Sequence, residues 1–294
     1  MKLLTYNYAG KEAVGVLDPA GEMIIPIAAV GLGYESMNDL IAAATPEEIA
    51  RLRGAVSAAP HGAIAYEDTV KVSPIPRPRQ DIICLGYNYF DHMKEFTHLK
   101  GIAVPEPPKH AIYFSKRVNE AVPDGGGITA HADLDGQLDY EVELAVIIGK
   151  DAKNVPAESA ADYIFGYTII NDVSARTLQS RHKQYYFGKS LDGFTPMGPW
   201  IVSGDEFTFP LSLAVSSFVN GELRQSSGTE HMLFSVPHII AELSAGMTLR
   251  AGTIISTGTP AGVGAGLQPA KFLRAGDVVE CVVEGIGRLR NVVV

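Results

Sequence analysis

The sequence predicts an α+β fold whose core is a β-sandwich or a β-roll. After residue 80, stretches of β-type residues follow one another at short intervals. The loops between them are rich in glycine and proline, and only two helical stretches interrupt them. Hydrophobic residues make up 46% of the chain and charged residues 19%, which is enough apolar material for one large domain, or for one large and one small domain.

Residues 1–72 are predicted to form a small N-terminal α+β domain. The expected elements, in chain order, are strands over 3–8, 13–17 and 23–27 and helices over 37–44 and 46–53. Thr45 precedes Pro46, so the second helix has an N-cap side chain followed by a proline at its first position. Gly54 comes directly afterwards and predicts the end of that helix.

A proline-rich segment, residues 73–80, is predicted to be a linker, because prolines at 74, 76 and 78 favour extended backbone. The rest of the chain, residues 81–294, is predicted to be the main domain. Its expected strands cover 82–85, 112–114, 140–148, 167–171, 200–203, 213–219, 253–257, 278–283 and 289–294, and its expected helices cover 91–99 and 234–243.

The acidic balance of the chain excludes several classes of partner. With 33 acidic and 24 basic residues, the formal net charge is −9 at pH 7, so neither a nucleic acid nor a membrane surface is expected as a partner. Cys84 and Cys281 supply no disulfide framework and no thiolate metal site. Residues 1–10 show no signal peptide, and no apolar run reaches the roughly 20 residues of a membrane span, so the expected location is the cytoplasm.

Residues 139–148 carry the first candidate for chemistry. Alternate side chains of a strand share a face, so Glu141 and Glu143 point the same way in a run that otherwise has the pattern of a strand buried on both faces. Two buried like charges are costly unless a proton or a cation compensates them, and carboxylates suit Mg²⁺, Mn²⁺ or Ca²⁺. The alternative is a solvated strand edge, which the continuous apolar run disfavours here.

Asp172 lies at the end of the β-type run over 167–171, where the chain turns away. Strand ends are common places for functional side chains, and Asp172 can supply a third carboxylate. The alternative, a turn or helix-capping aspartate, is the commoner role of an isolated Asp at such a position.

His92 and Glu95 lie three residues apart in the predicted helix over 91–99 and therefore share a face. A carboxylate beside an imidazole orients the ring and raises its basicity, as a general base near neutral pH requires. The alternative is an ordinary surface pair on an amphipathic helix, which is the commoner setting of one such pair.

Two further segments place glycine beside polar residues. Gly188-Lys189-Ser190 resembles part of a phosphate-binding loop, but Lys183 stands where that motif requires its first glycine, which excludes a P-loop. Lys189 remains a candidate for binding an anionic group, with a solvated surface lysine as the alternative. The glycines of residues 256–264 let backbone approach a ligand, although this segment alone predicts only a loop.

Together these segments resemble the fumarylacetoacetate hydrolase family over about residues 80–294, in the family's order along the chain. Each motif is short, and the series of five indicates the family. The motifs are Gly86-Tyr87-Asn88-Tyr89 with His92 and Glu95, Asp139-Tyr140-Glu141-Val142-Glu143, Asn171-Asp172-Val173-Ser174-Ala175-Arg176, Gly188-Lys189-Ser190-Leu191-Asp192 and Thr257-Gly258-Thr259-Pro260-Ala261-Gly262-Val263-Gly264.

The resemblance implies a mixed β-sandwich or roll of the family's C-terminal type, and a homodimer. It implies that Glu141, Glu143 and Asp172 bind Mg²⁺ or Mn²⁺, with Ca²⁺ as a substitute in vitro. It implies that His92 and Glu95 form an acid–base dyad on a mobile lid, as in the family's acylpyruvate hydrolases and related decarboxylases. The expected substrate contacts, including one aromatic residue of the pocket wall, are Arg176, Gln179, Lys189, Thr259 and Tyr87.

The activity that the resemblance implies is metal-dependent conversion of a small anionic 2-oxo acid through a metal-stabilised enolate. The main expectation is hydrolytic carbon–carbon cleavage of an acylpyruvate, a 1,3-diketo acid. His92, oriented by Glu95, would remove a proton from water, and the hydroxide would attack the distal carbonyl. Lys189 and Arg176 are expected to balance the charge of a dianionic substrate, with Lys189 also acting in catalysis.

Other reactions and other classes of function stay open at the level of the sequence. The same enolate serves oxaloacetate decarboxylation, oxaloacetate keto–enol tautomerisation, and isomerisation or hydration of unsaturated 2-oxo acids. A non-catalytic small-molecule binder is a remote alternative, because every residue of the expected triad and dyad is present. A hydrolase with a nucleophilic serine or cysteine is disfavoured, since no Gly-x-Ser-x-Gly motif occurs.

Overall fold

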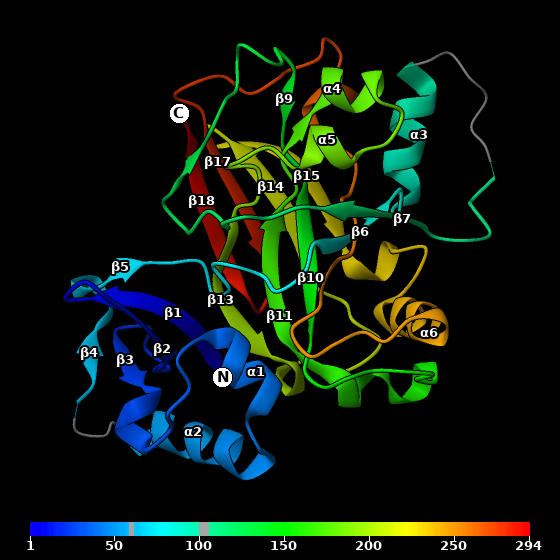
Figure 1. Ribbon diagram of the computed structural model, residues 1–294. Helices are drawn as coiled ribbons and strands as arrows, with labels where there is room; N and C mark the ends of the chain where they lie inside the picture. The colour runs from blue at the N-terminus through cyan, green and yellow to red at the C-terminus, as the bar shows by residue number, and fades with distance from the viewer. Residues whose placement is uncertain (59–61, 100–105) are drawn as a thin grey trace.

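The computed structural model describes residues 1–58, 62–99 and 106–294. Within these residues most strands belong to one large mixed sheet (Figure 1). Its strands are β1 (Lys2–Tyr8), β2 (Lys11–Leu17), β3 (Met23–Pro26), β4 (Ile64–Ala65), β5 (Val70–Lys71), β6 (Ile82–Gly86), β7 (Ile112–Lys116), β10 (Val142–Ile148), β11 (Ile164–Asn171), β13 (Met197–Ser203) and β16 (Ile254–Ser256). They follow the order β4–β3–β2–β1–β13–β11–β10–β16–β6–β7, with β5 paired to β1.

A second sheet packs against the first, with the order β15–β14–β17–β18–β8. Its strands are β8 (Gly127–Ile128), β14 (Ala214–Val219), β15 (Glu222–Gly228), β17 (Val278–Val283) and β18 (Gly287–Val293), and a separate short pair joins β9 (Leu138–Asp139) to β12 (Ser174–Ala175).

The α-helices are α1 (Met37–Ala43), α2 (Pro46–Ala58), α3 (Phe90–Leu99), α4 (Arg176–Arg181), α5 (Tyr186–Lys189) and α6 (Val236–Gly246). The described 3-10 helices are η1 (Ile27–Val30), η2 (Tyr66–Asp68), η3 (Ala157–Tyr163), η4 (Gly204–Glu206), η5 (Thr229–His231) and η6 (Gly264–Gly266). The predicted α+β sandwich is confirmed.

Strand β10 lies inside the sandwich, and all its residues are buried. Leu144, Val146 and Ile148 enter the core between the two sheets, which α6 also covers. Ala145 and Ile147 enter the core on the opposite face, which includes residues of the N-terminal unit. This alternation explains why the sequence of β10 is almost continuously apolar, and it confirms burial on both faces.

The N-terminal unit continues the large sheet. β1 pairs antiparallel with β13, with Lys2 opposite Val202 and Leu3 opposite Ile201. The boundaries expected at residues 72 and 80 stay predictions. Within the parts of the chain that the structure describes, no helix has the length and apolar character needed to cross a membrane.

Helix α2 begins as predicted but ends later. Thr45 Oγ1 accepts a hydrogen bond from the Glu48 N–H, while Glu48 accepts one from the Thr45 N–H, which is a capping box. The prediction that the helix ends at Gly54 is wrong, because α2 runs to Ala58. Ala55 packs in the interior beyond the glycine, and this burial offsets the roughly 1 kcal/mol that a glycine costs inside a helix.

The strand expected over 140–148 is interrupted at its start. β9 ends at Asp139, and β10 begins only at Val142. The Tyr140 N–H donates to the Asp139 side chain, and the Glu141 N–H donates to the Asn171 side chain instead of to a strand partner. The backbone therefore leaves the regular ladder where the predicted site begins.

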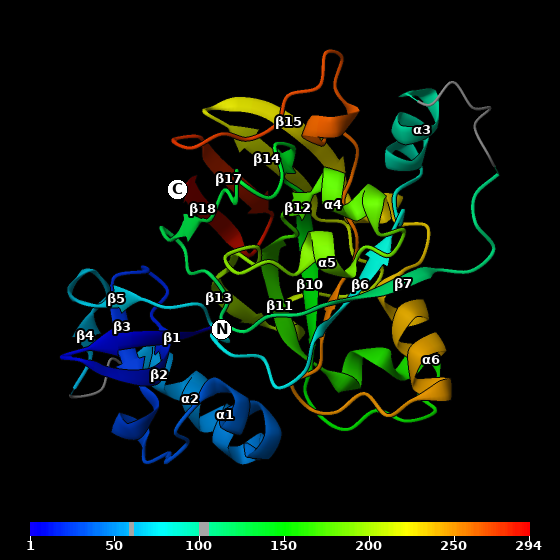
Figure 2. The same cartoon turned by 45° about the horizontal axis from the view of Figure 1, so that its top comes forward.

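The antiparallel pairing of β10 with β11 decides where the site lies. Val142, the first residue of β10, is opposite Asn171, the last residue of β11. Residues just before β10 and just after β11 therefore meet at one end of the sheet. Figures 1 and 2 show α4 and α5 over this end, with α3 beside them.

Candidate active site

Three buried carboxylates meet at this end of the sheet. Glu141, Glu143 and Asp172 each place one oxygen within 4.8 Å of the others. The strand pairing brings them together, and the Asp172 N–H donates to the Glu141 carbonyl at 2.8 Å. The structure thus places the three residues predicted as metal ligands in one cluster.

Two lysines contact this triad. Lys189 Nζ bridges Glu141 Oε2 at 2.7 Å and Asp172 Oδ2 at 2.6 Å. Lys116, which the sequence analysis did not single out, is fully buried, and its Nζ lies 2.8 Å from Asp172 Oδ1. Burial alone would raise the pKa of Glu141, but Lys189 and Arg176 outweigh it and hold the pKa at about 2. Burial would also lower the pKa of Lys189, yet Asp172 and Glu141 raise it above its ordinary value. Both groups are therefore charged.

Arg176, at the start of α4, connects the triad to a glycine-rich loop formed by residues 257–266. Its Nη1 lies 2.7 Å from Glu141 Oε1 and 3.1 Å from Gln179 Oε1. Its Nε donates at 2.9 Å to Asp139, which is fully buried and also accepts two backbone N–H groups of the loop, at 2.7 and 2.9 Å. Asp139 was part of a predicted motif but had no predicted role, and the structure shows that it fixes Arg176.

Glu143 has a different environment from the other two carboxylates. Its Oε2 accepts from Ser256 Oγ at 2.6 Å and from the Gly258 N–H at 2.9 Å, and none of the described cations forms an ion pair with it. Burial, reinforced by Asp172 and Glu141, raises the pKa of Glu143 to about 8. Near neutral pH this carboxyl is therefore mostly protonated until a cation arrives.

The residues fit a hard divalent cation. The buried charge cluster consists of Asp139, Glu141, Glu143, Asp172, Lys116, Arg176 and Lys189. With all four carboxylates ionised and three cationic side chains, the net charge of the cluster is −1. A bound divalent ion would change this net charge to +1. Asp172 Oδ1 is buried without a donor in hydrogen-bonding geometry among the described residues, although Lys116 Nζ is close. Carboxylate oxygens of this kind are the ligands that Mg²⁺ and Mn²⁺ prefer.

The predicted dyad lies on α3. His92 Nδ1 is 3.3 Å from Glu95 Oε2, and the His92 residue is only 6% exposed. Glu95 Oε1 accepts the Gly262 N–H at 3.0 Å, so the glycine-rich loop holds the carboxylate that orients the imidazole. A Cβ at Gly266 would lie 1.9 Å from Glu95 Cδ, so glycine at that position makes room for this carboxylate.

The backbone before α3 is strained and firmly held. Tyr87 has φ +52°, a left-handed conformation that bulky residues rarely adopt and that occurs at functional sites. The adjacent Asn88 side chain donates to the carbonyls of Phe234 and Thr257 and accepts the Phe234 N–H. Burial, followed by contact with Tyr185, raises the pKa of Tyr87 to about 12, so its hydroxyl stays protonated.

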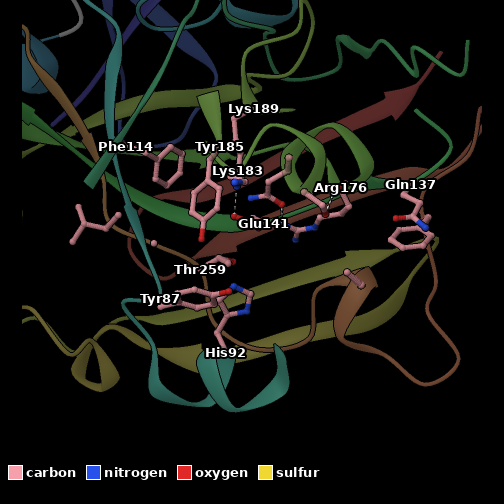
Figure 3. A pocket seen from close by; sticks show the side chains of 16 residues that line it. Tyr87, His92, Phe114, Gln137, Glu141, Arg176, Lys183, Tyr185, Lys189 and Thr259 are labelled. Atoms are coloured by element: carbon pink, nitrogen blue, oxygen red, sulfur yellow. Dashed lines mark hydrogen bonds and ion pairs between the residues drawn. The ribbon is translucent and has the colours of Figure 1, made fainter. Parts of the chain in front are cut away.

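A cavity of about 480 Å³ separates the dyad from the charge cluster (Figure 3). Figure 3 shows His92 and Tyr87 on one wall, Glu141, Arg176 and Lys189 on the opposite wall, and Thr259 between the two groups. Gln179 also lines this cavity, so all five residues predicted to contact substrate face it. Glu95, Glu143 and Asp172 are not among the lining residues.

Lys183 is a further lining residue that sequence reasoning missed. It lies between α4 and α5 with φ +61°, and it has no ion pair within residues 1–58, 62–99 and 106–294. In the sequence, Lys183 was noted only as the residue that excludes a P-loop. No spacing signal was available, because Lys183 lies beyond the end of α4 at Arg181 and its backbone is left-handed.

Comparison with known proteins agrees with this site. Residues 81–294 match the family model described as fumarylacetoacetate (FAA) hydrolase C-terminal. The chain is 48% identical over 219 residues to oxaloacetate tautomerase YisK of Bacillus subtilis (strain 168), a match that covers 74% of this chain and 71% of that protein.

Solved structures extend the likeness to the whole chain. The structure of a fumarylacetoacetate hydrolase from psychrophilic Exiguobacterium antarcticum is 38% identical, with a TM-score of 0.82 and coverage of 100% of this chain and 99% of that one. A 5-carboxymethyl-2-hydroxymuconate delta-isomerase from Mycobacterium smegmatis is 30% identical, with a TM-score of 0.76 and the same coverage. The family thus contains hydrolases and isomerases, and its enzymes use a divalent metal. This chain belongs to the fumarylacetoacetate hydrolase family, as its motifs predicted.

Proposed function

We propose that this protein is a divalent-cation-dependent enzyme that interconverts the keto and enol forms of oxaloacetate or of a closely similar 2-oxo dicarboxylate. The observation that carries the proposal is the pairing of His92 and Glu95 across one cavity from the carboxylate triad (Figure 3). The name of the relative with 48% identity, an oxaloacetate tautomerase, supports this choice of reaction.

His92 is the proton carrier in this proposal. With Nδ1 protonated as a donor to Glu95, Nε2 holds the lone pair and can accept a proton from the carbon between the two carbonyl groups of the substrate. The imidazolium, or water in exchange with it, then protonates the enolate oxygen. The reverse sequence restores the keto form, so the reaction needs neither bond cleavage nor a nucleophile.

The charge cluster prepares the site for an anion. Glu141, Glu143 and Asp172 would hold Mg²⁺ or Mn²⁺. The cation would act as a Lewis acid on the 2-oxo group and increase the acidity of the adjacent C–H group. Arg176 and Lys189 are already paired with carboxylates. Among the described lining residues, Lys183 is therefore the lysine or arginine left to balance the distal carboxylate of a dicarboxylic substrate.

Hydrolytic cleavage of an acylpyruvate, the main expectation from the sequence, is the second candidate. The size of the cavity favours it, since about 480 Å³ exceeds what a four-carbon acid fills. Phe114 and Tyr185, in edge-to-face contact at 5.3 Å, add an aromatic wall suited to a larger distal group. In that reaction His92 would deprotonate water instead of carbon.

Parallel assays separate the two candidates. Purified protein with Mg²⁺ or Mn²⁺ would be given oxaloacetate, with the enol followed by ultraviolet absorbance, and acetylpyruvate, with pyruvate and acetate measured. EDTA-sensitive enol–keto exchange without loss of carbon dioxide is the expected result. EDTA-sensitive formation of pyruvate and acetate from acetylpyruvate would favour the hydrolase, and release of carbon dioxide would indicate a decarboxylase.

The expected homodimer also stays a prediction, which sedimentation velocity would check.

A further inference from the structure

Gln225 is a fully buried residue of β15 that does not line the cavity and that the proposed reaction does not use. Its Nε2 donates to Thr259 Oγ1 at 2.7 Å and to the Pro260 carbonyl at 2.8 Å. Its Oε1 accepts from the Val142 N–H at 3.1 Å and from Ser217 Oγ at 2.9 Å. A side-chain amide has two donor hydrogens and an oxygen with two lone pairs, so this amide is saturated.

The contact with Val142 reaches the triad. Val142 is the residue between Glu141 and Glu143, and it lies at the first position of β10. Its N–H donates to Gln225, and its carbonyl accepts from Thr259 Oγ1 at 2.9 Å. The second sheet therefore holds the N–H of the residue that joins two triad members, and the glycine-rich loop holds its carbonyl. Because side chains follow their backbone, the direction of both glutamates depends on these bonds.

The contact with Thr259 reaches the substrate cavity. The hydroxyl of Thr259 gives its one proton to the Val142 carbonyl and accepts from Gln225 Nε2. A hydroxyl has a single proton, so this side chain cannot also donate to a substrate carboxylate while these bonds hold. The Thr259 backbone N–H donates to no acceptor in the described part of the chain, and Thr259 lines the cavity. The N–H is therefore the group of Thr259 that remains able to donate.

We propose that Gln225 is a positioning residue that couples the cation ligands to the substrate-facing loop through one buried amide. It touches neither cation nor substrate, and it acts through Val142 on one side and through Thr259 on the other. The inference rests on the proposed function for the presence of a divalent cation and an anionic substrate, but it does not depend on which reaction follows.

Gln225→Met tests the coupling, because it keeps the length of the side chain and removes its hydrogen-bonding groups. We expect the apparent Kd for Mn²⁺, measured by titration calorimetry without substrate, to rise at least about tenfold, as when outer partners of metal ligands are removed. Asn291→Leu is the matched control, because it removes another buried amide, whose acceptors in the described part of the chain are the carbonyls of Pro123 and Gly126. This control should lose similar thermal stability and bind Mn²⁺ within about twofold of wild type.

Two results would overturn the inference: wild-type Mn²⁺ affinity in Gln225→Met, or equal weakening in Asn291→Leu. If Gln225→Met does not fold, Thr259→Val and Thr259→Ser decide the matter. We expect weaker Mn²⁺ binding in Thr259→Val but not in Thr259→Ser, because serine keeps the hydroxyl. Equal Mn²⁺ affinity in these two variants would contradict the coupling. A wild-type protein that binds Mn²⁺ but turns over no 2-oxo acid defeats the proposed function and leaves the inference intact, whereas one that binds no Mn²⁺ defeats both.

Discussion

The carboxylate triad and the His92–Glu95 pair lie across one cavity but are built differently. The triad stands at the start of β10 and directly after β11, neighbouring strands whose facing ends are buried. The pair stands on α3, a helix on which Asp91 is exposed. Among the described contacts, Asn88 holds the start of that helix and one N–H of the glycine-rich loop holds Glu95.

This difference indicates that cation binding and proton transfer can fail separately. The sheet fixes the charges, so cation affinity should survive any disturbance confined to α3. Proton transfer needs an imidazole placed by a single helix, so it should respond to small changes in how that helix docks.

Glu143→Gln should have the largest effect, because it deletes a ligand charge at the sheet end of the site. Glutamine keeps the volume and an acceptor for Ser256 and Gly258. We expect the Kd for Mn²⁺ to rise on the order of a hundredfold or more, with turnover lost at ordinary Mn²⁺ concentrations. Metal-free thermal stability should not fall, because no described cation pairs with Glu143. Calorimetry and thermal unfolding check both points, and undiminished Mn²⁺ binding would contradict the assigned ligand.

His92→Ala should remove proton transfer without touching the sheet. A general base contributes about 10²- to 10⁴-fold to turnover, so kcat should fall within that range. The Kd for Mn²⁺ should stay within about twofold of wild type, because His92 lies across the cavity from the triad. A parallel loss of Mn²⁺ binding would show that cation binding at the triad depends on His92, and would contradict the separation of the two regions.

Gly266→Ala should disturb the pair from the loop side. The added Cβ would lie 1.9 Å from Glu95 Cδ, so the carboxylate must move and its bond to the Gly262 N–H must lengthen. We expect kcat to fall about tenfold or more with little change in Mn²⁺ affinity. Gly54→Ala is the control, because an added Cβ there meets open space and a helix gains from alanine. Unchanged kcat in the first variant would show that Glu95 does not orient His92.

Acidity should weaken cation binding through Glu143. Its pKa of about 8 lies above the ordinary 4.5, so below pH 8 the cation must displace a proton. Between pH 6 and 8 the apparent Kd for Mn²⁺ should rise about tenfold for each unit that the pH falls, with one proton released. Calorimetry in buffers of different ionisation enthalpy counts that proton. By the same shift, this group makes the metal-free fold less stable as pH rises from 4.5 to 8, since the folded state retains the proton.

Lys183→Met should have the smallest effect, since the side chain is exposed and its charge is screened. We expect the KM for oxaloacetate to rise about fivefold to tenfold at low salt, with kcat nearly unchanged. Arg181→Met, which removes an exposed cation from the same segment but outside the cavity lining, should leave KM unchanged. Equal effects of the two substitutions on KM would mean that Lys183 acts only through the overall electrostatic potential of this surface and not through a contact with the substrate.

Periodicity predicted the sandwich, the buried strand with Glu143 and the helix with His92, because each depends on local pattern. Strand alternation also predicted that Glu141 joins Glu143 at a cation site. The family motifs predicted Asp172 as the third ligand, since its meeting with Glu141 depends on strand pairing that no local pattern encodes. β15 was missed because its residues are mostly polar, although Asn220 and Gly221, with φ +51° and +80°, carry the sequence signal of a two-residue hairpin turn. Lys116 was missed because only the folded chain shows what its ammonium contacts.

The pairing of β1 with β13 limits how this chain can be shortened. In Figure 1 the blue strand β1 lies against β13, and the described contacts make it the outer neighbour of that strand. A fragment that begins near residue 81 would expose main-chain N–H and C=O groups of β13 around Ile201 and Val202 as an unprotected stretch of sheet edge. Such edges recruit other chains, so the fragment would be prone to aggregation even with every site residue in place.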